Sequence, residues 1–302
     1  MAVHFTSYVV CLSPPMKTPF WIRTLLLIAL THRISATETV VYKTVDGRGL
    51  KLSIEKPKAW RSSDRRPAIV FFFGGGWVGG STAQFLKQSE YLARRGLVGV
   101  RVEYRTIPKG DKGPPSVCCA DAKSAMRYVR AHAQELGIDP KRIAAAGGSA
   151  GGHIAAFTSM VEGQDAPGDD LTISCKANAL VLFNPVFNNG PGQYGNERMG
   201  ADYLKFSPAH HITALAPPTI VFLGDSDKLI AVDVLLKYSA EMKNAGARCE
   251  AHIYENSGHG FFNADPHYSA TLFETDTFLC SLGWLQGPPT LPKPQLKKIA
   301  ES

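Results

Sequence analysis

Residues 143–153 read Ile-Ala-Ala-Ala-Gly-Gly-Ser-Ala-Gly-Gly-His, and this stretch decides how the rest of the chain is interpreted. Its first four residues form an apolar run that predicts a short buried strand, and a helix is predicted from Ala150 onward. Between them, Gly147, Ser149 and Gly151 fit the pattern G-x-S-x-G. A sharp strand-to-helix turn crowds the backbone, so the glycines relieve clashes while the turn projects the serine from the sheet edge. The pattern therefore predicts a nucleophilic serine, with the N–H of Ala150 facing a developing negative charge.

A nucleophilic serine needs a general base, and His259 is the first candidate among the nine histidines. It lies in Ser-Gly-His-Gly-Phe, directly after a predicted strand and C-terminal to Ser149 in the chain. The glycines on either side allow the loop to place the imidazole over the sheet edge. His153 is the competing candidate, but it sits four residues after Ser149 on the same predicted helix, which directs its side chain away from the turn.

The base in turn needs an acid that orients it. Leu-Gly-Asp-Ser-Asp at 223–227 follows a predicted strand and places Asp225 and Asp227 at its carboxyl end. Asp227 is the preferred partner for the histidine, because a buried carboxylate there holds the tautomer and stabilises the imidazolium. Asp225 remains the alternative, with a loop-capping role as its other interpretation.

The run Phe73-Gly-Gly-Gly-Trp77 ends another predicted strand. Its glycines allow backbone N–H groups to point at a tetrahedral oxyanion, and one such donor is worth about 3–4 kcal/mol in other enzymes. A phosphate-binding loop is the rival interpretation, because the spacing from Gly74 to Ser81 nearly fits that motif. The position that requires lysine is Gly80, however, so this interpretation fails.

From about residue 38 the chain alternates predicted strands and helices. Eight strands are expected, the first two antiparallel and the others separated by helices, in one α/β domain over residues 37–286. The expected fold is a mostly parallel sheet with helices on both faces. Residues 184–218 are rich in Asn, Gly and Pro and are expected to form a small cap or a wall of the site.

Both ends of the chain are expected to differ from this body. Residues 1–36 predict a secretory signal peptide, with Met16 as the functional start and cleavage after Ala36, and hence a periplasmic or secreted protein. The apolar stretch is too short to span a bilayer, so no integral membrane span is expected after cleavage. Residues 287–302 are expected to be a disordered, proline-rich basic tail.

The formal net charge is +7, but much of it belongs to these ends. Residues 1–36 hold three basic residues and no acid, and residues 287–302 hold three lysines against Glu301, so the body is close to neutral. No basic stripe interleaved with aromatics is present, and a nucleic-acid partner is therefore not expected. The cysteines and histidines show no zinc-site spacing, so no metal is expected, and the cysteines are expected to be buried hydrophobes with at most one disulfide.

These motifs resemble the α/β-hydrolase superfamily, in the branch similar to hormone-sensitive-lipase-like and feruloyl or acetylxylan esterases. Further marks are Glu-Tyr-Arg at 103–105, Asp-Pro-Lys-Arg-Ile at 139–143 and Ser-Pro at 207–208. The resemblance implies a cofactor-free ester hydrolase with Ser149 as nucleophile, His259 as base and Asp227 as acid. It also implies an oxyanion hole built from the N–H groups of Gly74, Gly75 and Ala150. The family commonly has histidine before the three glycines, where this chain has Phe73.

Five aromatic residues near these motifs are candidates to wall an apolar pocket or, equally, to pack the core. Trp77, Tyr104 and Phe261 are the predicted substrate-binding residues, and Phe187 and Tyr194 are further candidates. The favoured function is a serine carboxylesterase that hydrolyses short acyl esters, including acetyl or feruloyl groups on polysaccharides. The alternatives are a serine peptidase of the same fold and a non-catalytic binding member. The sequence leaves the oligomeric state open.

Overall fold

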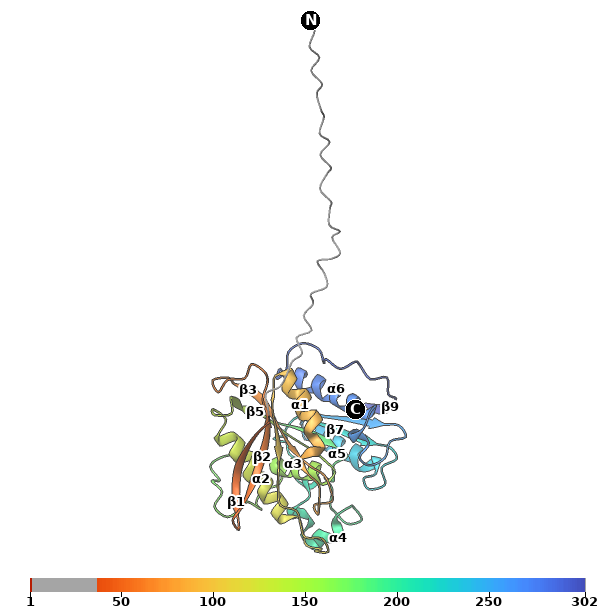
Figure 1. The fold of residues 1–302 in the computed structure, drawn as a ribbon. Coiled ribbons are helices and arrows are strands. Elements are labelled where there is room, and N and C mark those ends of the chain that lie inside the picture. Colours follow the sequence, from red (N-terminus) through yellow and green to blue (C-terminus); the bar gives the residue numbers. More distant parts are fainter. Residues whose placement is uncertain (2–36, 302) are drawn as a thin grey trace. The chain divides into compact units, whose positions relative to one another are not determined.

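The computed structural model describes Met1 and residues 37–301 and is built around one sheet (Figure 1). The predicted leader, with Met16 and its cleavage site, lies outside the described residues. The sheet contains nine described strands in the order β1-β2-β4-β3-β5-β6-β7-β8-β9. Their bounds are β1 Glu38–Val45, β2 Arg48–Glu55, β3 Arg66–Phe72, β4 Val98–Val102, β5 Ile138–Gly148, β6 Ala179–Phe183, β7 Thr219–Gly224, β8 Cys249–Tyr254 and β9 Lys298–Glu301.

Strands β4, β3, β5, β6, β7 and β8 run parallel, and the strands at both edges are antiparallel. The expected α/β fold with a mostly parallel sheet is confirmed. The parallel arrangement brings the carboxyl ends of β3, β5, β7 and β8 to the same edge of the sheet. The loops that follow these four strands carry the glycine run, Ser149, Asp227 and His259, so the topology gathers the predicted site residues.

Alternate residues of the parallel strands pack into two separate cores, as β3 illustrates. Val70 and Phe72 belong to one buried cluster, whereas Ile69 and Phe71 belong to the other. Since successive side chains of a strand point to opposite faces, a continuous apolar run fits a sheet that is covered on both sides.

Helices cover both faces (Figure 1). Helices α1 (Leu86–Arg95) and α6 (His267–Ser281) pack on the face of Phe71, where Arg95 Nε of α1 lies 2.7 Å from an Asp276 carboxylate oxygen of α6. Helices α2 (Ser116–Ala131), α3 (Ala150–Met160) and α5 (Val232–Asn244) pack on the face of Phe72. Helix α1 ends at Gly96, whose φ of 109° is a backbone conformation that favours glycine.

The C-terminal tail differs from the prediction of disorder. The Gly287 carbonyl accepts a hydrogen bond from Arg95 (2.9 Å), the Thr290 N–H donates to the Tyr91 hydroxyl (3.2 Å), and β9 then pairs antiparallel with β8. Lys298 of β9 also forms a 2.7 Å ion pair with Glu274 of α6. The tail adds the ninth strand because its lysines and backbone find partners that lie far away in the sequence.

Residues 184–218 form the wall segment that connects β6 to β7. It contains only short elements, namely α4 (Asn196–Met199) and the 3₁₀ turns η3 (Gly200–Lys205) and η4 (Pro208–His210). Two further short turns frame the site, η2 (Thr82–Phe85) before α1 and η5 (Phe261–Asn263) after β8.

The five described cysteines are free thiols, so the disulfide considered from the sequence is not formed among them. Four are buried, and burial raises the pKa of Cys118 to about 12, which keeps that thiol protonated. No described helix combines the length and the apolar character that crossing a membrane requires. Within residues 37–301, no cluster of three or more potential metal ligands is found.

Candidate active site

Ser149 lies in a strained turn between β5 and α3. Its backbone φ and ψ are 55° and −122°, a conformation that non-glycine residues adopt only when the surrounding structure enforces it. The neighbouring glycines are sterically required: a Cβ at Gly147 would lie 2.3 Å from the carbonyl oxygen of Gly151, and a Cβ at Gly151 would lie 2.1 Å from that of Phe72. The Ser149 N–H is held by the carbonyl of Phe183 at 2.9 Å. The predicted tight turn at the serine is confirmed.

The structure brings Ser149, His259 and Asp227 into one hydrogen-bonded row. The Ser149 hydroxyl lies 2.8 Å from His259 Nε2, and His259 Nδ1 lies 2.7 Å from Asp227 Oδ2. The Asp227 side chain is fully buried, whereas 24% of the His259 side chain is exposed. The row therefore leads from a buried carboxylate to a hydroxyl at the sheet edge.

Asp227 is fixed by its second carboxylate oxygen as well. Oδ1 accepts the N–H groups of Leu229 (2.8 Å) and Ile230 (3.1 Å). Burial by itself raises the pKa of Asp227, but the hydrogen bonds from His259 and these two amides outweigh it and hold the pKa below its ordinary value. The carboxylate is thus ionised at neutral pH and can stabilise a positive charge on the imidazole.

Asp225, the alternative acid, lies in a different environment. Its carboxylate accepts hydrogen bonds from the N–H of Ser257 (3.3 Å) and from the Ser226 hydroxyl (3.0 Å). These contacts tie together the loops that follow β7 and β8. Asp225 therefore has the loop-capping role, and no hydrogen bond joins it to His259 among the described residues.

His153, the alternative base, is buried beneath the site. The Trp77 indole N–H donates to its Nδ1 at 3.2 Å, and its Nε2–H donates to the carbonyl of Phe206 at 2.8 Å. Burial lowers the pKa of His153 to about 4, so the imidazole is neutral at ordinary pH. It joins the loop after β3 to the wall segment and has no hydrogen bond to the Ser149 side chain.

The predicted oxyanion loop requires one correction. The Gly74 N–H donates to the side-chain oxygen of Gln84 at 2.7 Å, so this amide is already engaged. Gly74 instead serves as the point of close approach to the serine turn, because a Cβ there would lie 2.7 Å from the Gly148 carbonyl oxygen. The next two residues, Gly75 and Gly76, have φ of 130° and 61° and line the pocket beside Ser149. Sequence reasoning passed over Gly76, although it is the third glycine of the run.

Phe73 occupies the position where the family commonly has a histidine, and its contacts show how the loop is supported without one. Its ring stacks on Tyr104 with centroids 4.1 Å apart and an interplanar angle of 14°. The Tyr104 hydroxyl donates to the Phe73 carbonyl at 2.6 Å. On the other side, the ring packs so closely on Gly80 that a Cβ there would lie 2.5 Å from it. Ring packing and one hydrogen bond therefore brace the start of the loop.

The cavity beside Ser149 measures about 260 Å³. Of the aromatic residues expected to wall it, only Tyr194 does so. Trp77, Tyr104 and Phe187 are buried packing residues, and Phe261 packs against Tyr254 and His267. The wall residues that sequence reasoning missed are Leu229, Phe262, Asn184, Gln84 and Asn263. Leu229 lies two residues after the predicted Asp227 motif and Phe262 directly after the predicted His259 motif, which is the signal that could have identified them.

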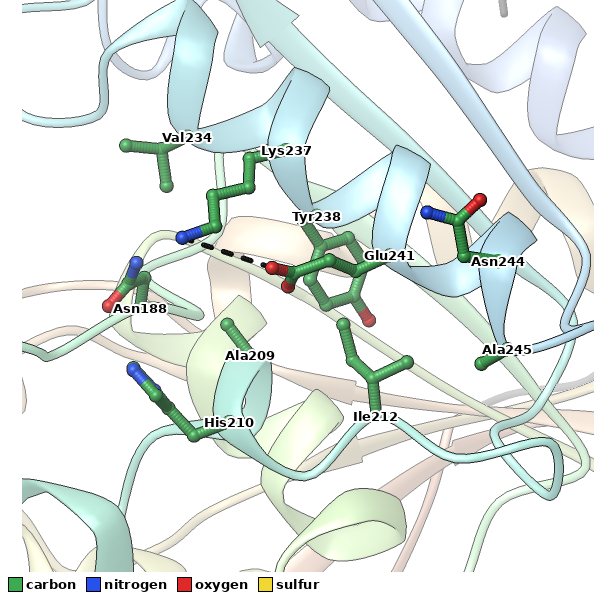
Figure 2. Close-up of a pocket in the computed structure, with 10 residues that line it drawn as sticks. All are labelled: Asn188, Ala209, His210, Ile212, Val234, Lys237, Tyr238, Glu241, Asn244 and Ala245. Carbon is green, nitrogen blue, oxygen red and sulfur yellow. Dashed lines mark ion pairs between the residues drawn. The ribbon is translucent and has the colours of Figure 1, made fainter.

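A second hollow of about 380 Å³ lies between the wall segment and α5 (Figure 2). Asn188 and His210 face it from the wall segment, and Lys237 and Glu241, which are 3.8 Å apart, face it from α5. It shares no lining residue with the Ser149 cavity. The chemistry predicted from the sequence therefore belongs to the smaller cavity.

Two family models match the chain. One described as BD-FAE matches residues 52–185, and one described as the prolyl oligopeptidase family matches residues 170–279. The first range contains the glycine loop and Ser149, and the second contains Asp227 and His259.

Two curated relatives are esterases by name. The chain is 30% identical over 241 residues to a probable isoprenylcysteine alpha-carbonyl methylesterase of Arabidopsis thaliana, covering 72% of this chain and 50% of that protein. It is 26% identical over 250 residues to an acetylxylan esterase of Xylanibacter ruminicola, covering 77% of this chain and 48% of that protein. The chain thus spans about half the length of these curated relatives.

Among solved structures, esterase 2 of Thermogutta terrifontis is 46% identical in its propionate-bound form. The match covers 83% of this chain and 96% of that chain, with a TM-score of 0.77. The same esterase has been solved with butyrate bound and phosphorylated by paraoxon.

Proposed function

The chain belongs to the esterase family of the α/β-hydrolase fold, and from that premise we propose that it hydrolyses short-chain carboxylic esters by a Ser149–His259–Asp227 acyl-enzyme mechanism. The observation that carries the proposal is the row of contacts of 2.8 Å and 2.7 Å from the serine through the histidine to the buried aspartate. The cavity beside the serine gives a substrate access to that row.

In the proposed reaction, Ser149 Oγ attacks the ester carbonyl carbon while its proton passes to His259 Nε2. Asp227, already ionised, stabilises the resulting imidazolium. The carbonyl π electrons move onto oxygen, and that oxyanion accepts hydrogen bonds from Ala150 N–H and from the glycine loop. Collapse of the intermediate breaks the bond to the alcohol, which leaves with the proton from His259. Water then attacks the acyl-enzyme by the same steps and releases the acid.

Gly76 takes the place of Gly74 in the proposed oxyanion hole, and Gly75 and Ala150 are kept from the sequence prediction. The Gly74 amide donates to Gln84, whereas no hydrogen bond from the N–H of Gly75 or Gly76 is recorded in residues 37–301. Both glycines line the cavity beside Ser149. Together with Ala150 at the start of α3, they supply three candidate donors.

The size of the cavity supports a short acyl group. At about 260 Å³ it lies below the roughly 300–1,000 Å³ of pockets that hold drug-sized ligands. Tyr194, Leu229 and Phe262 give it apolar walls, and the similar esterase 2 of Thermogutta terrifontis has been solved with propionate and with butyrate. We therefore propose acetyl to butyryl esters as the preferred substrates, ahead of feruloyl esters on polysaccharides.

A serine peptidase of the same fold is the second candidate, because residues 170–279 match the prolyl oligopeptidase family. The two candidates are separated by turnover of p-nitrophenyl acetate, butyrate and octanoate beside acetylated xylan and a panel of peptide amides. We expect acetate and butyrate to be hydrolysed fastest and Ser149→Ala to be inactive. Hydrolysis of peptide amides alone would favour the peptidase, and ester turnover that survives Ser149→Ala would contradict the mechanism.

Export is a separate part of the proposal and rests on sequence alone, namely the basic and apolar residues between Met16 and Ala36. N-terminal sequencing of the protein recovered outside the cytoplasm should begin after Ala36. A mature chain that still contains Trp21 would contradict it.

A further inference from the structure

A continuous row of amide hydrogen bonds joins the glycine loop to the loop of His259. The Gly74 N–H donates to Gln84 Oε1 (2.7 Å), and Gln84 Nε2 donates to Asn263 Oδ1 (3.2 Å). Asn263 Nδ2 then donates to the carbonyl of Gly260, the residue after His259 (2.8 Å). Each carboxamide thus uses its oxygen toward one side and its nitrogen toward the other.

The two loops joined in this way are far apart in the sequence. Gln84 belongs to η2, before α1, and Asn263 ends η5, after β8, a separation of 179 residues. Both side chains line the cavity beside Ser149, and Asn263 is exposed there. The contact therefore crosses the mouth of the cavity instead of lying in the core, where apolar packing already fixes positions.

A third amide fixes the histidine loop from the opposite side. The Gly260 N–H donates to Asn184 Oδ1 at 3.3 Å, and Asn184 Nδ2 lies 3.3 Å from His259 Nε2. Asn184 is completely buried at the end of β6, so it is a rigid anchor. Gly260 is consequently held through both its N–H and its carbonyl, once from the buried side and once from the mouth.

Other elements also hold the glycine loop at its two ends: the Phe73 carbonyl accepts the Tyr104 hydroxyl (2.6 Å), and the Trp77 carbonyl accepts the Ile107 N–H (2.8 Å). The Gly75 carbonyl accepts the N–H groups of Val78 (3.1 Å) and Gly79 (3.2 Å), which are bonds within the same loop. Trp77 anchors the far end through His153. Between the two ends, the bond from Gly74 to Gln84 links the loop to another element directly before the amides of Gly75 and Gly76.

We propose that Gln84 and Asn263 form an amide clamp that sets the position of the oxyanion donors relative to His259, so that both are positioning residues for the ester hydrolysis proposed above. The clamp rests on the proposed function for its catalytic consequence. Loss of the clamp leaves the row of Ser149, His259 and Asp227 intact but lets the donors drift from the oxyanion. Because such donors act mainly in the transition state, kcat falls while KM stays nearly constant.

The test compares Gln84→Met, which keeps the length of the side chain but removes both polar atoms, with Asn263→Ala and the double variant. Gln134→Met is the matched control, because Gln134 is exposed after α2 and lies outside the Ser149 cavity. With p-nitrophenyl butyrate we expect each single variant to lose about 10- to 100-fold in kcat, as small misplacements do, with KM within about threefold. The double variant should be no slower than the slower single one, because either change breaks the same row.

Rescue and exchange measurements separate positioning from general structural loss. Gln84→Glu keeps an acceptor for the Gly74 N–H and should recover part of the lost kcat, with an unchanged melting temperature in every variant. Backbone hydrogen exchange should rise in peptides covering 74–80 and also 258–264 in Gln84→Met, and in neither for Gln134→Met.

An unchanged kcat in Gln84→Met would overturn the clamp. Hydrogen exchange that rises in residues 74–80 alone would also overturn it, as would a double variant whose loss in kcat equals the product of the two single losses. An inactive wild-type protein that still shows coupled exchange between the two loops would instead contradict the proposed function and leave the clamp standing as a structural link.

Discussion

His259 contacts the Ser149 hydroxyl and His153 lies four residues after Ser149 on α3, but the surroundings of the two histidines differ in every respect that matters for chemistry. His259 is partly exposed and lies between a hydroxyl and a buried carboxylate. His153 is fully buried and lies between the indole of Trp77 and the carbonyl of Phe206. One imidazole contacts an ionised carboxylate, whereas burial holds the other neutral.

The difference shows how one residue type serves two purposes within a single site. In the proposed mechanism a base needs an ionised partner and access to the reacting proton, and Asp227 and the cavity would supply these to His259. A support needs two satisfied ring nitrogens and no charge, which burial and two neutral partners supply to His153. His153 links the far end of the glycine loop to the wall segment, and its hydrogen bonds go to Trp77 and Phe206 instead of to the Ser149 side chain.

Replacing each histidine by alanine should give the largest difference in kcat between the two positions. We expect His259→Ala to lose about 10⁶-fold in kcat, as removal of the histidine does in other serine hydrolases, with little change in stability. His153→Ala should retain activity within about tenfold, because it does not touch the reacting atoms. Steady-state turnover of p-nitrophenyl butyrate measures both, and a larger loss in His153→Ala would reverse the two assignments.

The two aspartates provide the next largest effect. Asp227→Asn should lose about 10⁴-fold in kcat, because the amide leaves the histidine with the wrong tautomer. Asp225→Asn is the matched control two residues away, and its rate should be close to that of the parent protein since Asp225 contacts Ser226 and Ser257 instead. Steady-state turnover of p-nitrophenyl butyrate measures both variants. Equal losses of kcat in the two would mean that Asp227 acts only in holding the loop.

Stability should respond in the opposite order to activity. His153→Ala leaves the Trp77 N–H and the Phe206 carbonyl buried without their partner, and we expect a loss of about 3 kcal/mol in the free energy of unfolding. Urea unfolding with His259→Ala as the comparison measures it. A larger loss of stability in His259→Ala would contradict the account of His153 as a support.

The pH dependence of stability should carry the signature of the buried histidine. The pKa of His153 is about 4 in the folded protein against 6.5 for an ordinary histidine, so between these values the unfolded chain binds more protons. Its contribution is therefore complete above about pH 6.5 and is lost as the pH falls toward 4, amounting to about 2 kcal/mol by pH 5. Urea titrations at several pH values test this, with His153→Gln as control.

The glutamine carboxamide in His153→Gln offers one acceptor and one donor but does not titrate. The free energy of unfolding of this variant should therefore fall less between pH 6.5 and pH 5 than that of the parent protein. The lowered pKa of Asp227 acts in a different window, because the stability it contributes is present above its ordinary value and lost only in more acidic solution. An unchanged pH dependence in His153→Gln would remove His153 as its source.

The residues that the sequence places correctly are those whose position follows from strand ends. Ser149, Asp227 and His259 each follow a strand of the parallel sheet, and such strands end at a common edge, so their meeting is predictable. The direction in which a single backbone N–H points cannot be predicted in the same way, because it depends on the local φ and ψ. Gly74 therefore donates to Gln84, and Gly76 takes its place beside Gly75 in the proposed oxyanion hole.

The predictions for the aromatic residues and for the C-terminal tail were wrong for a different reason. Trp77 and Tyr104 sit beside the motifs in sequence, yet their polar atoms bond to His153 and to the Phe73 carbonyl, contacts with distant or backbone groups that no local pattern reveals. The tail looked disordered because prolines prevent regular structure, but Lys298 finds Glu274 and β9 pairs with β8. Long-range polar partners decide these positions.

Labelling with paraoxon tests the central assignment most directly, because phosphorylation of a serine requires its activation by the neighbouring base. Intact mass and peptide mapping of the parent protein, His153→Ala and His259→Ala would be compared after the same exposure. We predict a single phosphoryl adduct on Ser149 in the parent and in His153→Ala, and almost none in His259→Ala. An adduct on another residue, or equal labelling of Ser149 in His259→Ala, would contradict the account.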